Sequence, residues 1–121
     1  MEKKHLIYVS CFCTSILLSA CSSNGPKPED SLLKLAEFNI EQAQQAGAHE
    51  YAPLVLRDAE QHLDKAREAM ADEDYMTATQ FLEKSTLDAK YAMVKTESDK
   101  ASLAAEQLKS DLETLQQSIS N

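Results

Sequence analysis

The sequence predicts an all-α protein, and three observations support this prediction. The chain after residue 28 is rich in Ala, Leu, Glu, Gln and Lys, which are strong helix formers. Glycine and proline are confined to two short stretches, residues 25–28 and 47–53. Apolar residues recur at intervals of three and four, which is the spacing of one helix face, and no useful stretch alternates as a β-strand does. A chain of 121 residues has room for one domain.

Residues 1–20 are typical of a secretion signal peptide. A short basic region, Lys3 to His5, precedes an apolar run over residues 6–18. The run has the length of a signal-peptide core and is shorter than the roughly 20 residues of a transmembrane helix. The basic end is expected to stay on the cytoplasmic side, because Lys and Arg resist translocation.

The next residues, Leu18, Ser19, Ala20 and Cys21, resemble the bacterial lipobox, in which a leucine and two small residues precede a cysteine. Small residues let an extended backbone enter a narrow peptidase cleft. The resemblance implies cleavage before Cys21 and acylation of that cysteine, with chains such as palmitate. Each buried methylene contributes about 0.8 kcal/mol, so two or three chains hold a protein stably on a membrane. The alternatives are an ordinary signal peptide followed by a chance cysteine, and an uncleaved anchor.

Cysteine usage and charge limit the possible functions. Cys11 and Cys13 would leave with the signal peptide, so residues 21–121 would contain no disulfide and no free thiol. The whole chain has a net charge of −8, and loss of Glu2, Lys3 and Lys4 would leave −9. Nucleic acid is therefore not an expected partner, because phosphate binding needs clustered Lys and Arg. Adhesion to anionic lipid is disfavoured for the same reason.

Residues 21–28 are expected to form a flexible tether, because Gly25, Pro26 and Pro28 interrupt regular structure. In lipoproteins of this type, an aspartate directly after the cysteine commonly retains the protein in the inner membrane. Ser22 occupies that position. The resemblance therefore implies the periplasmic side of the outer membrane, with the inner membrane as the alternative.

A helical domain is predicted over residues 29–121, with helices at about 29–46, 52–71 and 75–118. Gly47 is a suitable C-cap for the first helix, and Pro53 falls in the first turn of the second, where proline is tolerated. The acidic turn over residues 72–74 can cap the third helix through Asp72 or Asp74. The expected arrangement is an antiparallel hairpin or three-helix assembly with a long, coiled-coil-like C-terminal helix. One face of the second helix carries Ala52, Leu56, Ala59, Leu63, Ala66 and Met70.

Two apolar stripes can be traced along the predicted third helix. The first stripe is expected to face the second helix, and it consists of Tyr75, Ala78, Leu82, Ser85, Ala89 and Ala92. Beyond about residue 96 the third helix outruns the shorter helices, so the later part of the second stripe, from Ala101 to Ile119, is left without a partner in the same chain. Two interpretations are open: a coiled-coil contact with a second copy or another envelope protein, and a frayed arm whose stripe is too narrow to matter. This second stripe consists of Leu87, Tyr91, Val94, Ser98, Ala101, Ala105, Leu108, Leu112, Leu115 and Ile119.

No catalytic residues, cofactor or metal site are expected. His49 is placed in a loop, and His62 with Asp58 has the spacing of a solvated pair on one helix face, while a metal site needs three or four ligands. The 72–74 turn lacks the length and the glycine of a calcium loop. Aromatic residues are interpreted as packing residues: Tyr51, Tyr75, Tyr91, Phe38 and Phe81. Surface ion pairs are expected at Lys84/Asp88, Lys95/Asp99 and Lys109/Glu113.

The segment from Ala46 to Ala92 resembles a known bacterial family. Its Gly-Ala-x-x-Tyr-Ala-Pro string at residues 47–53 is followed by regularly spaced Leu and Ala and by an acidic turn ending in Asp74-Tyr75. This pattern is similar to the domain-of-unknown-function family number 4398, over roughly residues 31–100. The family usually has glycine where this chain has Glu73. Members look like envelope lipoproteins, and some continue into a peptidoglycan-binding domain of the outer-membrane-protein-A type, which these 121 residues do not include.

Three functions are weighed. The preferred one is a non-enzymatic outer-membrane lipoprotein with a structural or adaptor role, anchored by Cys21 and able to self-associate or to bind an envelope protein through its C-terminal helix. The second is an alanine-zipper-like lipoprotein that contacts peptidoglycan; the final Ser-Ile-Ser-Asn, in place of a terminal lysine, disfavours covalent linkage. The third and least favoured is a small periplasmic protein that binds a ligand or metal.

Overall fold

The computed structural model describes residues 25–120, so the predicted signal peptide, its lipobox and Cys21 lie outside the described residues. The described chain forms four helices: α2 (Asp30–Ala46), α3 (Ala48–Tyr51), α4 (Pro53–Ala71) and α5 (Tyr75–Ser120). Residues 25–120 contain no β-strand. The protein is therefore all-helical, as the sequence predicts, and the three long helices lie within a residue or two of the expected bounds.

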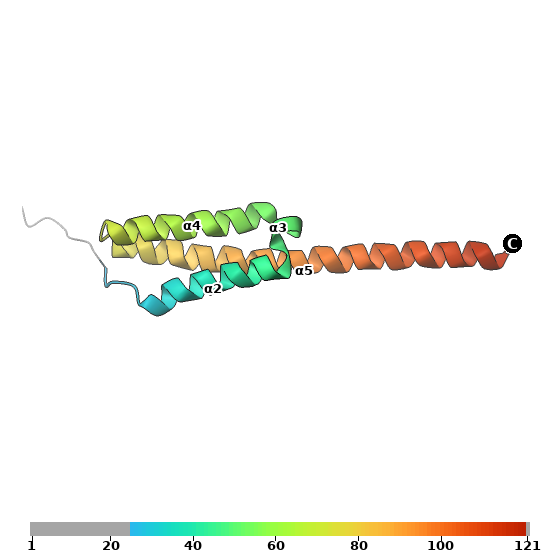
Figure 1. Ribbon diagram of the computed structural model, residues 1–121, viewed down its shortest axis with the longest axis horizontal. Helices are drawn as coiled ribbons and strands as arrows, with labels where there is room; N and C mark the ends of the chain where they lie inside the picture. The colour runs from blue at the N-terminus through green and yellow to red at the C-terminus, as the bar shows by residue number, and fades with distance from the viewer. Residues whose placement is uncertain (1–24, 121) are drawn as a thin grey trace, which may run out of the picture.

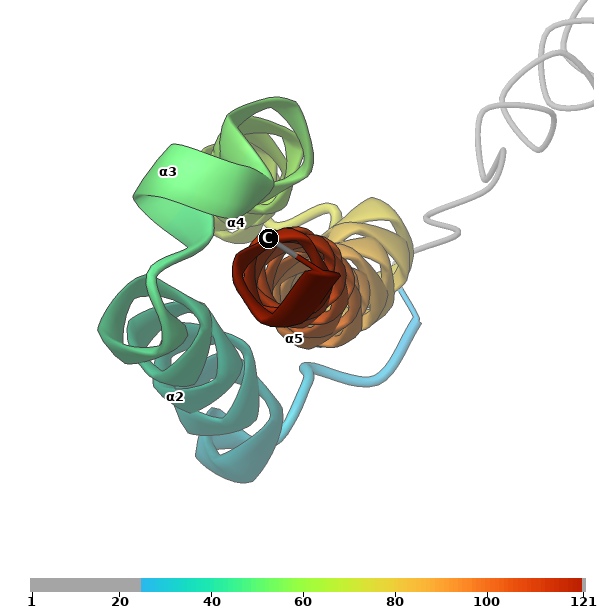
Figure 2. The same cartoon turned by 90° about the vertical axis from the view of Figure 1, so that its right-hand side faces the viewer.

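The long helix α5 is the central element of the fold. Figure 1 shows α2 and α4 lying along its first half, with α2 running in the direction of α5 and α4 in the opposite direction. Each of the two packs more extensively on α5 than on the other, and the end-on view in Figure 2 shows them flanking it. At 1.5 Å per residue, the 46 residues of α5 span about 69 Å, whereas the 19 of α4 span about 28 Å. The rest of α5, from Lys100 to Ser120, extends beyond the bundle, and we call this segment the arm (Figure 1).

The end of α2 confirms one prediction and corrects another. Gly47 adopts a left-handed conformation with φ of 94°, and its N–H donates to the carbonyl groups of Ala43 and Gln44, as expected of a C-cap glycine. The loop predicted around His49 is wrong, because residues 48–51 form the short helix α3. The reason is tertiary: Ala48 is completely buried and holds this turn against the bundle.

The turn between α4 and α5 is tight and acidic. The carboxylate of Asp74 accepts a hydrogen bond from the backbone N–H of Thr77 at 3.2 Å, which confirms Asp74 as the cap of α5. Glu73 has a φ of 59°, and it is the only non-glycine residue of 25–120 in the left-handed region. The turn therefore has the backbone shape that glycine would favour, although glutamate occupies it.

We expect Glu73→Gly to stabilise the protein by up to about 1 kcal/mol, because glycine adopts the left-handed conformation without a Cβ clash. Asp72→Gly is the matched control: Asp72 has a φ of −83°, so glycine relieves nothing there and should cost about 0.5–1 kcal/mol. Thermal unfolding followed by circular dichroism measures both changes. A lower melting temperature for Glu73→Gly would contradict the prediction.

The core consists of small and branched aliphatic residues from all four helices. The side chain of Ser85 donates a hydrogen bond to the backbone carbonyl of Ala59 at 2.8 Å, so α4 and α5 approach closely at this level. The first stripe is buried from Ala78 to Ala92, as predicted, whereas Tyr75 is only half-buried. The buried apolar residues are Ala36, Ile40, Ala43, Ala48, Ala52, Leu56, Ala59, Leu63, Ala66, Ala78, Leu82, Ala89 and Ala92.

Polar side chains add bridges between α2 and α4. The guanidinium of Arg67 on α4 donates to the carboxylate of Glu37 on α2 at 2.9 Å, and also to Asp64 at 3.2 Å. The hydrogen bond to Glu37 raises the pKa of Arg67 above its ordinary value. Gln44 donates to Glu60 across the same interface at 2.8 Å. These bridges are largely solvated and orient the two helices more than they stabilise them.

The described end of the predicted tether lies against the bundle. Pro28 is buried, and the backbone of Gly25 passes close enough to Met76 for a Cβ on Gly25 to lie 3.6 Å from the Met76 Cβ. The chain therefore enters the bundle beside the first turn of α5. Residue 25 and the C-terminus of α5 lie at opposite ends of the molecule (Figure 1).

Candidate functional site

The arm is the most exposed part of the described chain. Every residue from Lys100 to Ser120 is exposed, including four large apolar residues of the second stripe. Leu108, Leu112, Leu115 and Ile119 have exposed fractions of 65%, 59%, 57% and 83%. Apolar residues in a continuous row on one helix face are a common mark of a protein contact site. The third helix therefore continues beyond the bundle, and no other part of residues 25–120 covers its second stripe there.

The second stripe begins inside the bundle and not at the base of the arm. Leu87, Tyr91 and Val94 are 67%, 57% and 62% exposed, although α2 and α4 cover α5 at this level. Ala89 and Thr96, which are completely buried, occupy the other side of α5. The stripe therefore runs along the open side of α5 from the bundle to the end of the arm.

Two of the five aromatic residues predicted to pack in the protein are exposed instead. Tyr91 belongs to the open side of α5, and Phe38 on α2 is also 56% exposed, so neither is a core residue. The physical reason is the small size of the core residues, since alanines bring the helix axes close and leave no room for rings between them. Tyr51, Tyr75 and Phe81 are half-buried at the edges of the helix contacts.

Lys100 joins the base of the arm to the bundle. Its ammonium donates a hydrogen bond to the backbone carbonyl of Ala46, and it lies 5.2 Å from the centre of the Tyr51 ring. A cation at this place suits the negative end of the α2 dipole, and α2 has no basic residue in its own last turn. Sequence reasoning missed this contact; the absent basic residue is the signal that could have indicated it.

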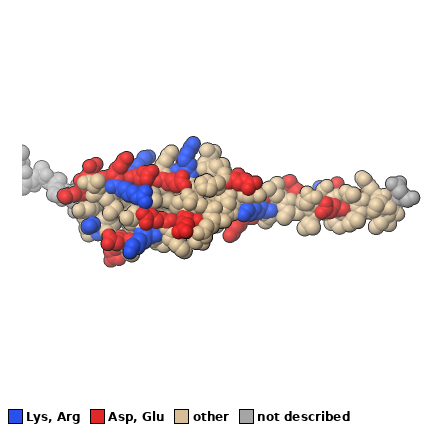
Figure 3. All heavy atoms as spheres, viewed as in Figure 1, with Lys and Arg blue, Asp and Glu red and all other residues tan. Residues whose placement is uncertain are grey.

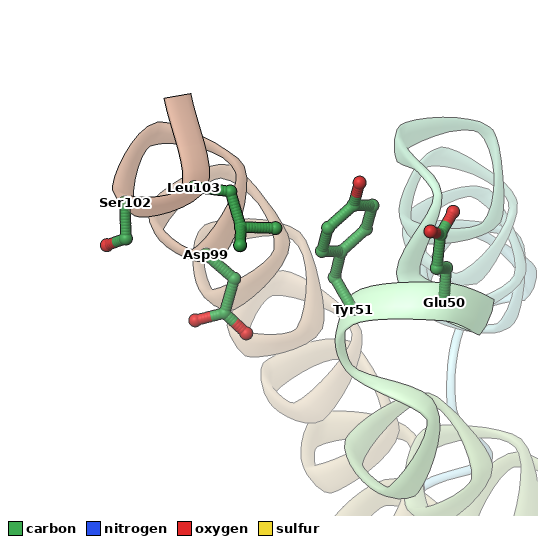
Figure 4. Close-up of a pocket in the computed structure, with 5 residues that line it drawn as sticks. All are labelled: Glu50, Tyr51, Asp99, Ser102 and Leu103. Atoms are coloured by element: carbon green, nitrogen blue, oxygen red, sulfur yellow. The ribbon is translucent and has the colours of Figure 1, made fainter. Parts of the chain in front are cut away.

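Beside this contact lies an open hollow of about 340 Å³ (Figure 4). It is lined by Glu50 and Tyr51 of α3 and by Asp99, Ser102 and Leu103 of α5. The Asp99 carboxylate is engaged by Lys95 at 2.8 Å, and this hydrogen bond raises the pKa of Lys95. The hydroxyl of Ser102 donates to the backbone carbonyl of Ser98 at 3.0 Å and not to either carboxylate of the hollow.

His62 has a different partner from the one predicted. Its Nδ1 lies 2.7 Å from the carboxylate of Asp88 on α5, so the Asp58/His62 surface pair is wrong. His62 lies on the edge of α4 that borders α5, where its ring also stacks on Phe81 with centroids 5.7 Å apart. The ammonium of Lys84 lies over the same Phe81 ring, at 5.1 Å from its centre. This cluster ties α4 to α5.

Of the three ion pairs predicted along α5, the structure contains one. Lys95/Asp99 is confirmed. Lys84/Asp88 is wrong, because Asp88 pairs with His62 and Lys84 lies on Phe81. No ion pair joins Lys109 to Glu113 within residues 25–120. In that region too, no three His, Cys, Asp or Glu side chains gather in a way that could hold a metal ion.

The lipobox residues Leu18, Ser19, Ala20 and Cys21 lie outside the described residues, so the proposed lipidation stays a prediction. Within the described part of the chain, none of the helices combines the length and apolar character needed to cross a bilayer.

The fold and surface define a class of protein: a small α-helical bundle whose longest helix projects as an exposed arm. The chain belongs to the family described as domain of unknown function (DUF4398), which it matches over residues 31–108. This confirms the resemblance stated from the sequence. The matched residues include the bundle and the base of the arm. Neither the curated proteins nor the solved structures contain a match to this chain.

Proposed function

We propose that this protein is a non-enzymatic lipoprotein of the outer membrane, held on its periplasmic side by acylated Cys21. In this proposal the bundle connects the anchor to the arm. The arm, with its coiled-coil-like second stripe, is an adaptor surface that binds another helix. The structural observation that carries the proposal is the position of the two ends of the described chain. Residue 25, which follows the proposed anchor by four positions, lies at the end of the bundle opposite to the arm (Figure 1).

The geometry supports an adaptor that reaches away from a membrane. The 46 residues of α5 extend for about 69 Å, and those from Ala104 to Ser120 are exposed beyond the last contacts with the bundle. A chain anchored near residue 25 would therefore present its exposed stripe far from the bilayer. The net charge of −8 also disfavours adhesion of the bundle to anionic lipid, so the arm is free to point outward.

The test of the anchor is Cys21→Ser. We expect this variant to lose its acyl chains and to accumulate as uncleaved precursor or as soluble periplasmic protein, because no other residue supplies the thioether. Membrane fractionation and the intact mass of the purified protein are the measurements. Cys13→Ser is the matched control, since it removes a cysteine of the predicted signal peptide and should leave acylation unchanged.

A second variant tests which membrane holds the protein, independently of whether Cys21 is acylated. Ser22→Asp should keep the acyl chains but move the protein to the inner-membrane fraction. If Cys21→Ser protein still sediments with the outer membrane at the mass of the acylated form, the lipoprotein proposal is wrong.

A second candidate function is non-covalent contact of the arm with peptidoglycan. The observation in its favour is the length of the exposed arm, which would carry the stripe toward the cell-wall layer if the chain is anchored at Cys21 in the outer membrane. Co-sedimentation of the purified protein with isolated sacculi tests it. Binding that survives truncation of the arm after Lys100 would contradict a role for the arm.

A further inference from the structure

The second stripe extends along α5 for nine steps of alternating four and three residues, from Leu87 to Ile119, without a break. This is the repeat that lets two helices supercoil, with alternate stripe positions inserting between those of the partner. Its first three residues are exposed on the bundle itself, Ser98 lies at the base of the arm, and the remainder lie on the arm. Any helix that covers the stripe must therefore lie along both the bundle and the arm.

We propose that the partner of this stripe is a second copy of the same chain, which pairs in parallel and in register through α5. The orientation rests on the proposed function, because two copies anchored near residue 25 in one membrane point the same way. The choice of a second copy as partner rests on the charges beside the stripe and does not depend on the anchor.

The two flanks of the stripe are electrically balanced in a strongly acidic protein. Each of the five four-residue steps has two flanking positions, the residue just after its first stripe residue and the residue just before its last. These ten positions carry three lysines and three carboxylates. The charged ones are Lys90, Lys95, Lys109, Asp88, Glu97 and Asp111. Their charges sum to zero, whereas the whole chain has a net charge of −8. Two copies can therefore meet along this face without net repulsion, and nothing on it selects a strongly basic or acidic partner.

On the arm, the surplus acidic residues lie away from the stripe. Asp99, Glu106 and Glu113 recur every seven residues and so form a row of their own on the side of α5. In Figure 3 charged atoms of both signs cover much of the bundle, while the visible face of the arm is mostly uncharged. This distribution keeps the acidic rows of two paired copies on the outside of the pair.

The flanking charges also favour the parallel orientation. In an antiparallel pair that overlaps the whole stripe, each flank faces the same flank of the second copy. Glu97 would then lie next to Asp111 of the second copy, and Lys95 next to its Lys109, each contact occurring twice by symmetry. In a parallel pair each flank faces the opposite one. Among the ten flanking positions the like-charge contact is then Lys90 with Lys95 of the second copy, which occurs twice, so the parallel pair has two such contacts and the antiparallel pair four. The ammonium of Lys95 is held by Asp99 at 2.8 Å, which reduces that repulsion.

Sedimentation equilibrium of the chain from residue 21, carrying Cys21→Ser, tests the choice of partner without any lipid. We expect a reversible monomer–dimer equilibrium at micromolar concentrations. Leu108→Asp combined with Leu115→Asp should weaken it by at least about a hundredfold, because two charges per chain would enter an apolar contact. Ser110→Asp with Gln117→Asp is the matched control: it adds the same charges to the same exposed helix, off the stripe, and should leave the dimer intact.

Cysteine crosslinking tests the orientation, because the native cysteines are at positions 11, 13 and 21 and none remains in this protein. Ala101→Cys alone should form a disulfide-linked dimer under mild oxidation, since identical stripe positions face each other only in a parallel pair. Lys90→Glu should tighten the dimer about fivefold by replacing the contact with Lys95 by an attractive one.

A protein that stays monomeric at high micromolar concentration would overturn the proposal of a second copy. Crosslinking only in a mixture of Ala101→Cys and Ala105→Cys, together with no tightening of the dimer by Lys90→Glu, would overturn the parallel orientation. Neither result depends on acylation, which is tested separately by Cys21→Ser in cells. Failure of the dimer and failure of the anchor are therefore distinguishable.

Discussion

Leu82→Ala is expected to destabilise the bundle by about 3 kcal/mol, within the 2–5 kcal/mol range for buried leucines. Leu82 is completely buried in the first stripe, where α5 contacts its neighbours. Most other core residues are alanines, so few side chains are large enough to move into the space that Leu82 leaves. In a domain of this size, 3 kcal/mol corresponds to a melting temperature lower by about 12 °C or more.

Leu54→Ala is the matched control for this measurement. Leu54 is on α4 and is 64% exposed, so the same truncation there should change the melting temperature little. Equal losses from the two variants in thermal or urea unfolding would mean that α5 does not pack through its first stripe. Leu63, buried on α4 as the sequence predicts, should behave like Leu82 when truncated, with a smaller loss because it retains 6% exposure.

Ala89→Leu should destabilise the bundle by an amount comparable to Leu82→Ala. Ala89 is completely buried one turn after Ser85, whose hydroxyl contacts the backbone of α4, so there is no space between the helices for a larger side chain. Overpacking of this kind typically costs 1–3 kcal/mol, and the upper end applies here because the adjoining surface is helix backbone that cannot rotate aside.

The control is Ala104→Leu, which makes the same change on the exposed arm. Measured at low micromolar concentration, it should leave the unfolding midpoint unchanged, because nothing in residues 25–120 packs on that position. Stability retained in Ala89→Leu would show that α2, α4 and α5 are not in close contact at this level.

The amino-acid sequence alone determined the fold class and nearly all helix bounds. These follow from local physics: strong helix formers between the stretches that contain glycine and proline, Gly47 in the left-handed C-cap, Pro53 in a first turn, and Asp74 as an N-cap. The three-four spacing also identified the buried face of α4 and both stripes of α5. The exception was α3, whose four residues carry too little periodicity to predict a helix and are held by the burial of Ala48.

The sequence predicted that the first stripe faces the second helix, and the structure places it there. Only the tertiary structure showed that the second stripe is already open beside the bundle, where Leu87, Tyr91 and Val94 are exposed. The small side chains of Ala78, Ser85 and Ala89 allow the close helix approach, and α5 therefore turns that side toward α2 and α4 and leaves its leucine-rich side open. The partners of His62 and Lys100 lie 26 and 54 residues away in the chain. Contacts at such separations depend on how the helices pack, which no local pattern specifies.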